Sequence, residues 1–315
     1  MHFAYPSRKS SNPPPFRPRQ SRIPIPTLRK GRLKSIAVIA TIIIGSFWII
    51  SKLFDSRDAP LFRRPSGNPP VVLVTVLDER KHGMGHSQSI RENREQYAKR
   101  HGYETMFVHA GDYELEETAG SWARTPAMRH ALTNFPECRY VWFLDQDAYI
   151  MEPAKSLEER LLEPDLLGKI MRRDISVVPN SIIKTFSHLK GGDIELVLTQ
   201  DFEGLSTGSL VVRNGEWAKF FLETWFDPLY RSYKFRKAEE HALEHMVQWH
   251  PTILSKLAVV PQRTINSYIK GNEEEGFQEG DFVVRAAGCG REGAPSCEEQ
   301  LSKYRATWQQ AFSQA

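Results

Sequence analysis

The sequence predicts an α/β fold, with helices on both faces of a mixed, mainly parallel sheet, preceded by one N-terminal membrane-spanning helix. Two continuous apolar runs, residues 71–76 (VVLVTV) and 140–144 (YVWFL), predict the sheet, because strands buried on both faces have this character. An uncharged run, residues 35–51, predicts the membrane helix. The 315 residues suffice for one domain of about 250 residues with appendages.

The N-terminal part divides into a tail, an anchor and a stem. Residues 1–34 are rich in Pro, Ser and Arg and carry nine Lys or Arg but no acid, which predicts a disordered cytosolic tail. Residues 35–51 would span about 26 Å as a helix, slightly less than a bilayer core, and the flanking lysines can reach the interface. Residues 52–70 are a stem, and residues 71–315 would face the lumen of a single-pass type II protein.

Two other interpretations of residues 35–51 are weaker. A buried core helix is one alternative, but this segment is apolar on every face and follows a disordered tail, which favours a membrane span. A cleaved signal peptide would have a shorter basic region and a small-residue cleavage site after the apolar run.

Charge and cysteine content limit the function of the body. Beyond residue 34, 33 basic residues face 38 acidic ones, so a nucleic-acid-binding body is disfavoured. Cys289 and Cys297, eight positions apart in a Gly/Pro-rich stretch, are expected to pair in an oxidising lumen, and Cys138 to be a lone buried thiol. Three free thiols are the alternative.

The body is predicted to alternate strands and helices. A helix over residues 87–100 ends at His101-Gly102, and a second over 125–134 has Pro126 near its start. The βαβαβ order of the first half predicts parallel strands. The further strands are expected at 103–109, 176–178, 209–212, 257–260 and 281–285, and the further helices at 216–229 and 239–249.

An acidic pair follows the apolar run 140–144. Asp145 and Asp147 lie at the carboxyl end of a predicted buried strand, the edge at which open α/β sheets bind ligands. Two carboxylates at this spacing can both reach one Mn²⁺ or Mg²⁺, which would neutralise a nucleoside-diphosphate leaving group. Two solvated aspartates in a surface turn are the alternative.

Six ordered blocks, covering about residues 71–310, resemble the Golgi galactosyl/mannosyltransferase family 34. The resemblance is strongest to its fungal α-1,6-mannosyltransferase branch, the subunits of the mannan polymerase complex. The blocks are WARTPAMRHAL (122–132), YVWFLDQDAYIMEP (140–153), QDFEGLSTGSLVVRNGEW (200–217), EEHALEHMVQWHP (239–251), VPQRTINSY (260–268) and GDFVVRAAGC (280–289).

The resemblance implies a GT-A fold and a Mn²⁺-dependent, retaining transfer from a nucleotide sugar. It implies GDP-mannose as donor and an α-1,6-linked mannan backbone on N-glycans as product, made in the Golgi lumen beside other mannosyltransferase subunits. The galactosyl branch instead uses UDP-galactose. A non-catalytic scaffold subunit of such a complex is a further alternative.

The resemblance also suggests roles for individual residues. It implies that Asp145 and Asp147 are the metal-binding DxD, that Trp122 and Arg124 line the donor site, and that Ser206 and Gly208 lie beside the sugar. Glu239 and Glu240 would reach the transferred sugar or acceptor, and His241 occupies the place of a glutamine seen in the plant branch. The nucleotide is expected over the ends of the first and third strands, where Thr75 is a candidate contact.

Two further groups are candidates from the residues alone. Asp201 and Glu203 are expected in a loop before a strand, either as donor-sugar contacts or as loop caps. Residues 82–86 (HGMGH) are expected to form a flexible loop, which either covers the nucleotide or is merely solvated.

Two positions depart from the family pattern. Arg285 stands where the family often has a histidine as third metal ligand, and arginine cannot bind a metal but can grip a diphosphate. Ser206 replaces a longer asparagine. These departures weaken the expectation of tight Mn²⁺ binding and motivate the scaffold alternative.

Overall fold

The computed structural model describes residues 39–46, 68–115, 117–291 and 293–314. The chain divides into two units, Met1–Ala59 and Pro60–Ala315. In the first unit residues 39–46 are helical. The predicted tail, most of the predicted anchor and nearly all of the stem lie outside the described residues, so these remain predictions. Among the described helices, none has the length and apolar character needed to cross a membrane.

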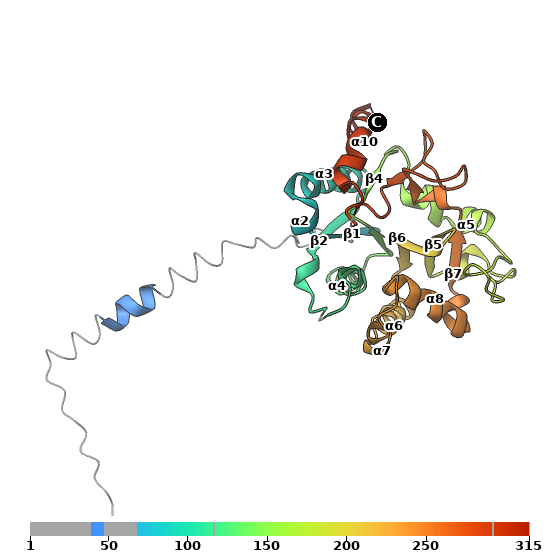
Figure 1. Ribbon diagram of the computed structural model, residues 1–315, viewed down its shortest axis with the longest axis horizontal. Coiled ribbons are helices and arrows are strands. Elements are labelled where there is room, and N and C mark those ends of the chain that lie inside the picture. The colour runs from blue at the N-terminus through green and yellow to red at the C-terminus, as the bar shows by residue number, and fades with distance from the viewer. Residues whose placement is uncertain (1–38, 47–67, 116, 292, 315) are drawn as a thin grey trace, which may run out of the picture. The chain divides into compact units, whose positions relative to one another are not determined.

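The described part of the second unit is built on a six-stranded sheet with the order β2-β1-β3-β6-β5-β7 (Figure 1). Strands β1, β2 and β3 are parallel, β6 runs antiparallel to β3 and β5, and β7 is again parallel to β5. The sheet is therefore mixed and mainly parallel, as predicted. The strands are β1 (Val71–Leu77), β2 (Glu104–His109), β3 (Tyr140–Leu144), β5 (Leu196–Asp201), β6 (Gly204–Arg213) and β7 (Leu257–Val260).

Helices cover both faces of this sheet (Figure 1). Because side chains alternate along a strand, Val72 and Val74 of β1 face one core and Val71 and Leu73 the other. The first core is closed by α4 (Arg124–Asn134), α6 (Glu216–Trp225) and α8 (Glu239–Trp249). On the other face lie α3 (Met84–His101), α5 (Pro164–Ile170) and α10 (Cys297–Gln314).

A second, three-stranded sheet has the order β4-β9-β8, formed by Ala148–Ile150, Val283–Arg285 and Ser267–Tyr268. Its β4 begins directly after the acidic pair, and the β4–β9 pairing places Arg285 opposite Ala148. This small sheet therefore brings a late arginine beside the end of β3.

The remaining described elements are short. The helices are α2 (Glu79–His82), α7 (Pro228–Ser232) and α9 (Pro251–Leu254). Tighter 3-10 turns occur at Ala110–Asp112, Gly120–Ala123, Gly191–Asp193 and Gln262–Thr264, and a π-helical turn at Glu158–Leu162.

Most predicted elements are confirmed, some with shifted ends. The helix predicted for 87–100 begins earlier, at Met84, and ends before Gly102, whose φ of 67° is easily adopted only by glycine. The predicted strand 176–178 is wrong, because Ser176 forms only an isolated bridge with Lys184. The helix predicted for 216–229 ends at Trp225, and α7 starts anew at Pro228.

The cysteine predictions are confirmed. Cys289 and Cys297 form a disulfide with a Cα–Cα distance of 4.9 Å, and Cys138 is a buried free thiol. The disulfide fastens the segment after β9 to the first residue of α10.

Candidate active site

A cavity of about 740 Å³ opens beyond the carboxyl ends of β1 and β3. Its lining comes from distant parts of the chain: the segment after β1, the start of α4, the acidic turn after β3, the start of α8, and the loop after β9. Residues 145–147, 236–240 and 288–291, apart from Gly290, contribute to it. This is the edge at which the sequence predicted the nucleotide.

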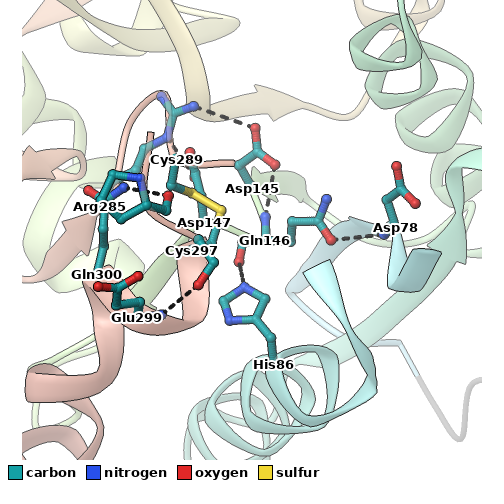
Figure 2. Close-up of a disulfide and its surroundings, with 12 residues drawn as sticks. Asp78, His86, Asp145, Gln146, Asp147, Arg285, Cys289, Cys297, Glu299 and Gln300 are labelled. Carbon is teal, nitrogen blue, oxygen red and sulfur yellow. Dashed lines mark hydrogen bonds and ion pairs between the residues drawn. A yellow bond between two sulfur atoms is a disulfide. The ribbon is translucent and has the colours of Figure 1, made fainter. Parts of the chain in front are cut away.

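The acidic turn is held from behind by polar side chains. Arg94 of α3 is fully buried and donates to the carbonyl oxygens of Asp145 at 3.0 Å and Ala148 at 2.8 Å. Gln146 accepts from the backbone N–H of Asp78 at 2.8 Å, and its carbonyl lies 2.8 Å from Nε2 of His86 (Figure 2). The turn thus has a fixed shape, which aims both aspartates at the cavity.

Two arginines hold the aspartate carboxylates. Nε of Arg285 donates to Oδ1 of Asp147 at 2.7 Å, and an Nη of the same guanidinium lies 3.5 Å from Oδ2 of Asp145 (Figure 2). Nη2 of Arg124 donates to the same Oδ2 at 3.1 Å. Burial alone would lower the pKa of Arg285, but the charges of Asp147 and Asp145 raise its pKa well above the ordinary value. Arg285 is therefore permanently charged.

The position of Arg285 depends on small neighbours. A Cβ added at Gly208 would lie 2.0 Å from Cζ of Arg285, so a side chain at this position would displace the guanidinium. Oγ of Ser206 accepts from Arg285 at 3.4 Å and from Nδ2 of Asn266 at 2.9 Å. The sequence block containing Ser206 and Gly208 therefore forms the surface against which this guanidinium packs.

The second acidic pair begins α8. Glu239 is buried, lies 3.3 Å from Nε of Arg124 and accepts from Oγ of Ser121 at 2.5 Å. Glu240 accepts from the N–H and the hydroxyl of Thr207, both at 3.2 Å. The chain enters the helix through Ala238 with φ of 45°, a left-handed conformation that costs energy for a residue with a side chain and is often retained at functional sites.

Basic side chains line the outer part of the cavity. Lys81, Arg236 and Arg291 all contribute to its wall, and none has a carboxylate within ion-pair distance in the described residues. Lys237 pairs with Glu203 at 2.8 Å. The outer wall therefore offers positive charge to an anionic ligand.

Eight of the twelve predicted site residues take part in this arrangement, and four do not. Asp145, Asp147, Arg124, Glu239, Glu240 and Arg285 line the cavity, and Ser206 and Gly208 lie behind Arg285. Thr75, Trp122, Asp201 and His241 are absent from its lining.

The four exceptions have structural reasons. The hydroxyl of Thr75 donates to the carbonyl of Leu144 at 2.9 Å, and Trp122 is buried in the core. Asp201 ends β5 instead of lying in a loop; it caps the turn to β6 and accepts from Tyr268 at 2.7 Å. His241 lies against Glu244 outside the cavity, and burial lowers its pKa.

The predicted loop 82–86 is also wrong. Glu79–His82 and Met84–His101 are helical, and His82 lines the cavity while His86 supports the acidic turn. Sequence reasoning missed Arg94, Ser121 and the basic residues of the outer wall. An arginine inside a helix or beside a loop carries no local signal that distinguishes it from a solvated side chain.

A resident divalent ion does not fit the donor set. Within the described residues, no group of three His, Cys, Asp or Glu is arranged to hold a metal. Of the four carboxylate oxygens of Asp145 and Asp147, three accept from Gln146 N–H, Arg124 or Arg285 in the described part of the chain. The Arg285 guanidinium lies against both carboxylates and repels a cation.

The fold is of the GT-A type that is found in glycosyltransferases. A crystal structure of a glycosyltransferase involved in the glycosylation of the major capsid of PBCV-1 superposes with a TM-score of 0.54 and 15% sequence identity. The match covers 76% of this chain and all of that one, and it supports the fold alone. Residues 67–296 match the sequence profile of the galactosyl transferase GMA12/MNN10 family, and the chain belongs to this family.

Curated relatives carry two kinds of name. A Schizosaccharomyces pombe alpha-1,2-galactosyltransferase is 32% identical over 225 residues, which cover 69% of this chain and 60% of the relative. Saccharomyces cerevisiae MNN10, named a probable alpha-1,6-mannosyltransferase, is 34% identical over 215 residues, which cover 63% of this chain and 54% of the relative. Saccharomyces cerevisiae MNN11, also named a probable alpha-1,6-mannosyltransferase, is 28% identical over 274 residues, which cover 79% of this chain and 65% of the relative. The matches thus span about half to two thirds of these relatives' lengths.

Proposed function

We propose that this chain is a retaining hexosyltransferase that moves mannose from GDP-mannose onto an α-1,6-linked mannan backbone of N-glycans. One observation carries the proposal: the same cavity is lined by a basic wall, suited to a diphosphate, and by the carboxylates of buried Glu239 and half-buried Glu240, suited to a cationic sugar transition state. The names of MNN10 and MNN11 support mannose as the sugar.

The proposed reaction uses the two ends of the cavity. The nucleoside lies over the ends of β1 and β3, and the diphosphate faces Arg285 and the basic wall. The acceptor hydroxyl bonds to the anomeric carbon on the face from which the diphosphate departs, and its proton passes to the departing phosphate oxygen. The carboxylate of Glu240 stabilises the positive charge that develops on the sugar, while Glu239 keeps Arg124 in place.

The location and the partners are part of the proposal. We propose a Golgi membrane protein of type II orientation, whose luminal body works beside other mannosyltransferase subunits. The uncharged run 35–51 and the basic tail before it support this orientation. Mn²⁺ or Mg²⁺ at Asp145 and Asp147 stays a prediction of the sequence, and the arginines on both carboxylates argue against it.

The purified 315-residue chain, offered a panel of nucleotide sugars and an α-mannoside acceptor, tests the proposal. We expect transfer from GDP-mannose, and a loss of about 10²–10³-fold in turnover for Asp147→Asn and for Glu240→Gln, because each removes a preorganised charge. Circular dichroism and the melting temperature check that both variants fold. Asp147→Asn with parental turnover would show that the acidic turn has another role.

A galactosyltransferase is the second candidate, favoured by the relatives named alpha-1,2-galactosyltransferases. Competition separates the two, because GDP should inhibit a mannosyltransferase and UDP a galactosyltransferase. A chain that turns over none of the donors would instead be the scaffold subunit considered above.

A further inference from the structure

We propose that the Arg285 guanidinium is a built-in cation that replaces the divalent ion in this chain, so that nucleotide binding and sugar transfer need no added metal. This inference rests on the proposed function, since it concerns how the same cavity holds the diphosphate.

The first argument is the position of the charge. The guanidinium lies between the two aspartates, 2.7 Å from Asp147 and 3.5 Å from Asp145 (Figure 2). A cation that bridges these carboxylates and faces the cavity is in the place where a shared metal ion would have to bind. A divalent ion added there would be repelled by Arg285 and also by Arg124, which lies 3.1 Å from the same oxygen of Asp145.

The second argument is that the site is built around the arginine. The space that a side chain at position 208 would need is filled by Cζ and Nη1 of Arg285. Behind the guanidinium, Ser206 is held by Asn266 at 2.9 Å and contacts the Tyr268 hydroxyl at 3.1 Å, which in turn donates to Asp201. These contacts fix the guanidinium and lower its freedom to move aside for an ion.

The third argument is that further cations compensate for the smaller charge. A guanidinium carries one positive charge and a divalent ion two, but Lys81 and Arg291 line the same cavity. Cε of Lys81 lies 3.7 Å from the point where a Cβ at Gly290 would be. Cζ of Arg291 lies 3.6 Å from the corresponding point at Gly288. Lys81 flanks the loop that follows Arg285 and Arg291 belongs to that loop, so a diphosphate bound at the guanidinium has two further positive charges nearby.

Titration calorimetry on the purified 315-residue chain tests the proposal with GDP and with UDP, once with EDTA and once with Mn²⁺. We expect the dissociation constant of the bound nucleotide to differ by less than about threefold between the two conditions, against the about tenfold or greater loss that a required metal would cause. Electron paramagnetic resonance of Mn²⁺ should show no tightly bound ion in the nucleotide complex.

Arg285→His sharpens the test, because histidine can complete a ligand set with the two aspartates. In EDTA this variant should lose about tenfold or more in nucleotide affinity, since the charge-assisted fork is gone, and Mn²⁺ should restore it. Arg129→His, on the exposed face of α4, is the matched control and should behave as the parent.

The outcomes are distinct for the two proposals. Nucleotide affinity of the parental chain that falls about tenfold or more on chelation overturns the built-in cation and leaves the transferase intact. Binding of neither nucleotide in either condition overturns both. The chelation experiment uses the unaltered chain, so it decides the question even where Arg285→His fails to fold.

Discussion

Two buried arginines reach the same acidic turn from opposite sides, and their surroundings differ. Arg94, behind the turn, donates to the backbone carbonyls of Asp145 and Ala148 and has no carboxylate within ion-pair distance in the described residues. Burial lowers its pKa to about 9. Arg285, in front, holds two carboxylates, whose charges raise its pKa. One side of the turn is therefore held by dipoles and the other by full charges.

This difference separates folding from function at one place in the molecule. Backbone carbonyls are present in every sequence, so Arg94 fixes the course of the chain whichever ligand is bound. The carboxylates and the guanidinium of Arg285 face a cavity, and their charges remain available to a ligand. We therefore expect substitutions behind the turn to reduce stability first, and those in front to reduce binding first.

The largest expected effect comes from replacing each of the two arginines, Arg94 and Arg285, by lysine. Arg94→Lys should lower the free energy of unfolding by about 3 kcal/mol, because the shorter lysine lacks the guanidinium that donates from one nitrogen to both carbonyls and from the other to Asn93. Arg285→Lys keeps a cation between the aspartates and should cost less than about 1 kcal/mol of stability, yet weaken nucleotide binding by about tenfold.

Urea unfolding and calorimetric titration of GDP and UDP measure the two quantities. The comparison fails if Arg94→Lys binds nucleotide poorly at parental stability, or if Arg285→Lys is the less stable of the two.

The residues on the cavity side of the acidic turn were easier to predict from the sequence than Arg94 behind it. Asp145, Asp147, Glu239, Glu240 and Arg285 belong to motif blocks, and the structure brings them to one cavity. Arg94 was missed because its partners lie more than 50 positions away, and only the packing of α3 against β4 reveals them.

Elements with strong local signals were predicted well. Helix α8 (Glu239–Trp249) and strand β7 (Leu257–Val260) have the predicted ends. Strand β5 (Leu196–Asp201) and helix α10 (Cys297–Gln314) were missed. Helix α10 is rich in polar residues and buries few side chains, Leu301 and Trp308 among them, so tertiary packing determines its stability more than sequence pattern does.

An intermediate effect is expected from the disulfide, which fastens the segment after Arg285 to α10. Replacing both Cys289 and Cys297 by alanine should lower the free energy of unfolding by about 2 kcal/mol, since closing a short loop removes limited entropy from the unfolded chain. If the bond also positions the front of the turn, nucleotide affinity should fall as well.

Denaturant unfolding with and without a reductant, together with the titration above, gives both numbers. Cys138→Ala is the matched control, because this buried thiol is not part of a disulfide, and it should leave nucleotide affinity unchanged. If the double variant binds nucleotide as tightly as the parent, the disulfide contributes to stability but does not position the front of the turn.

The smallest expected effect concerns Glu244, a buried acid whose partner is again a backbone dipole. Its Oε1 accepts from the N–H of Leu205 at 3.0 Å, and His241 lies 3.9 Å away. Burial raises the pKa of Glu244 to about 7. A raised folded-state pKa contributes stability that is complete below the unfolded value of 4.5 and is lost as the pH rises through about 7.

Glu244→Gln keeps the acceptor for Leu205 and removes the titration. The free energy of unfolding of the variant minus that of the parent should therefore rise by about 1–2 kcal/mol when the pH increases from about 5 to about 8. This figure is reduced for partial solvent screening. Urea unfolding at both pH values measures this, with the exposed Glu279→Gln as a control that should change neither. An equal difference at the two pH values would mean that Glu244 is already ionised at pH 5, and that a backbone dipole alone can hold a buried charge in this fold.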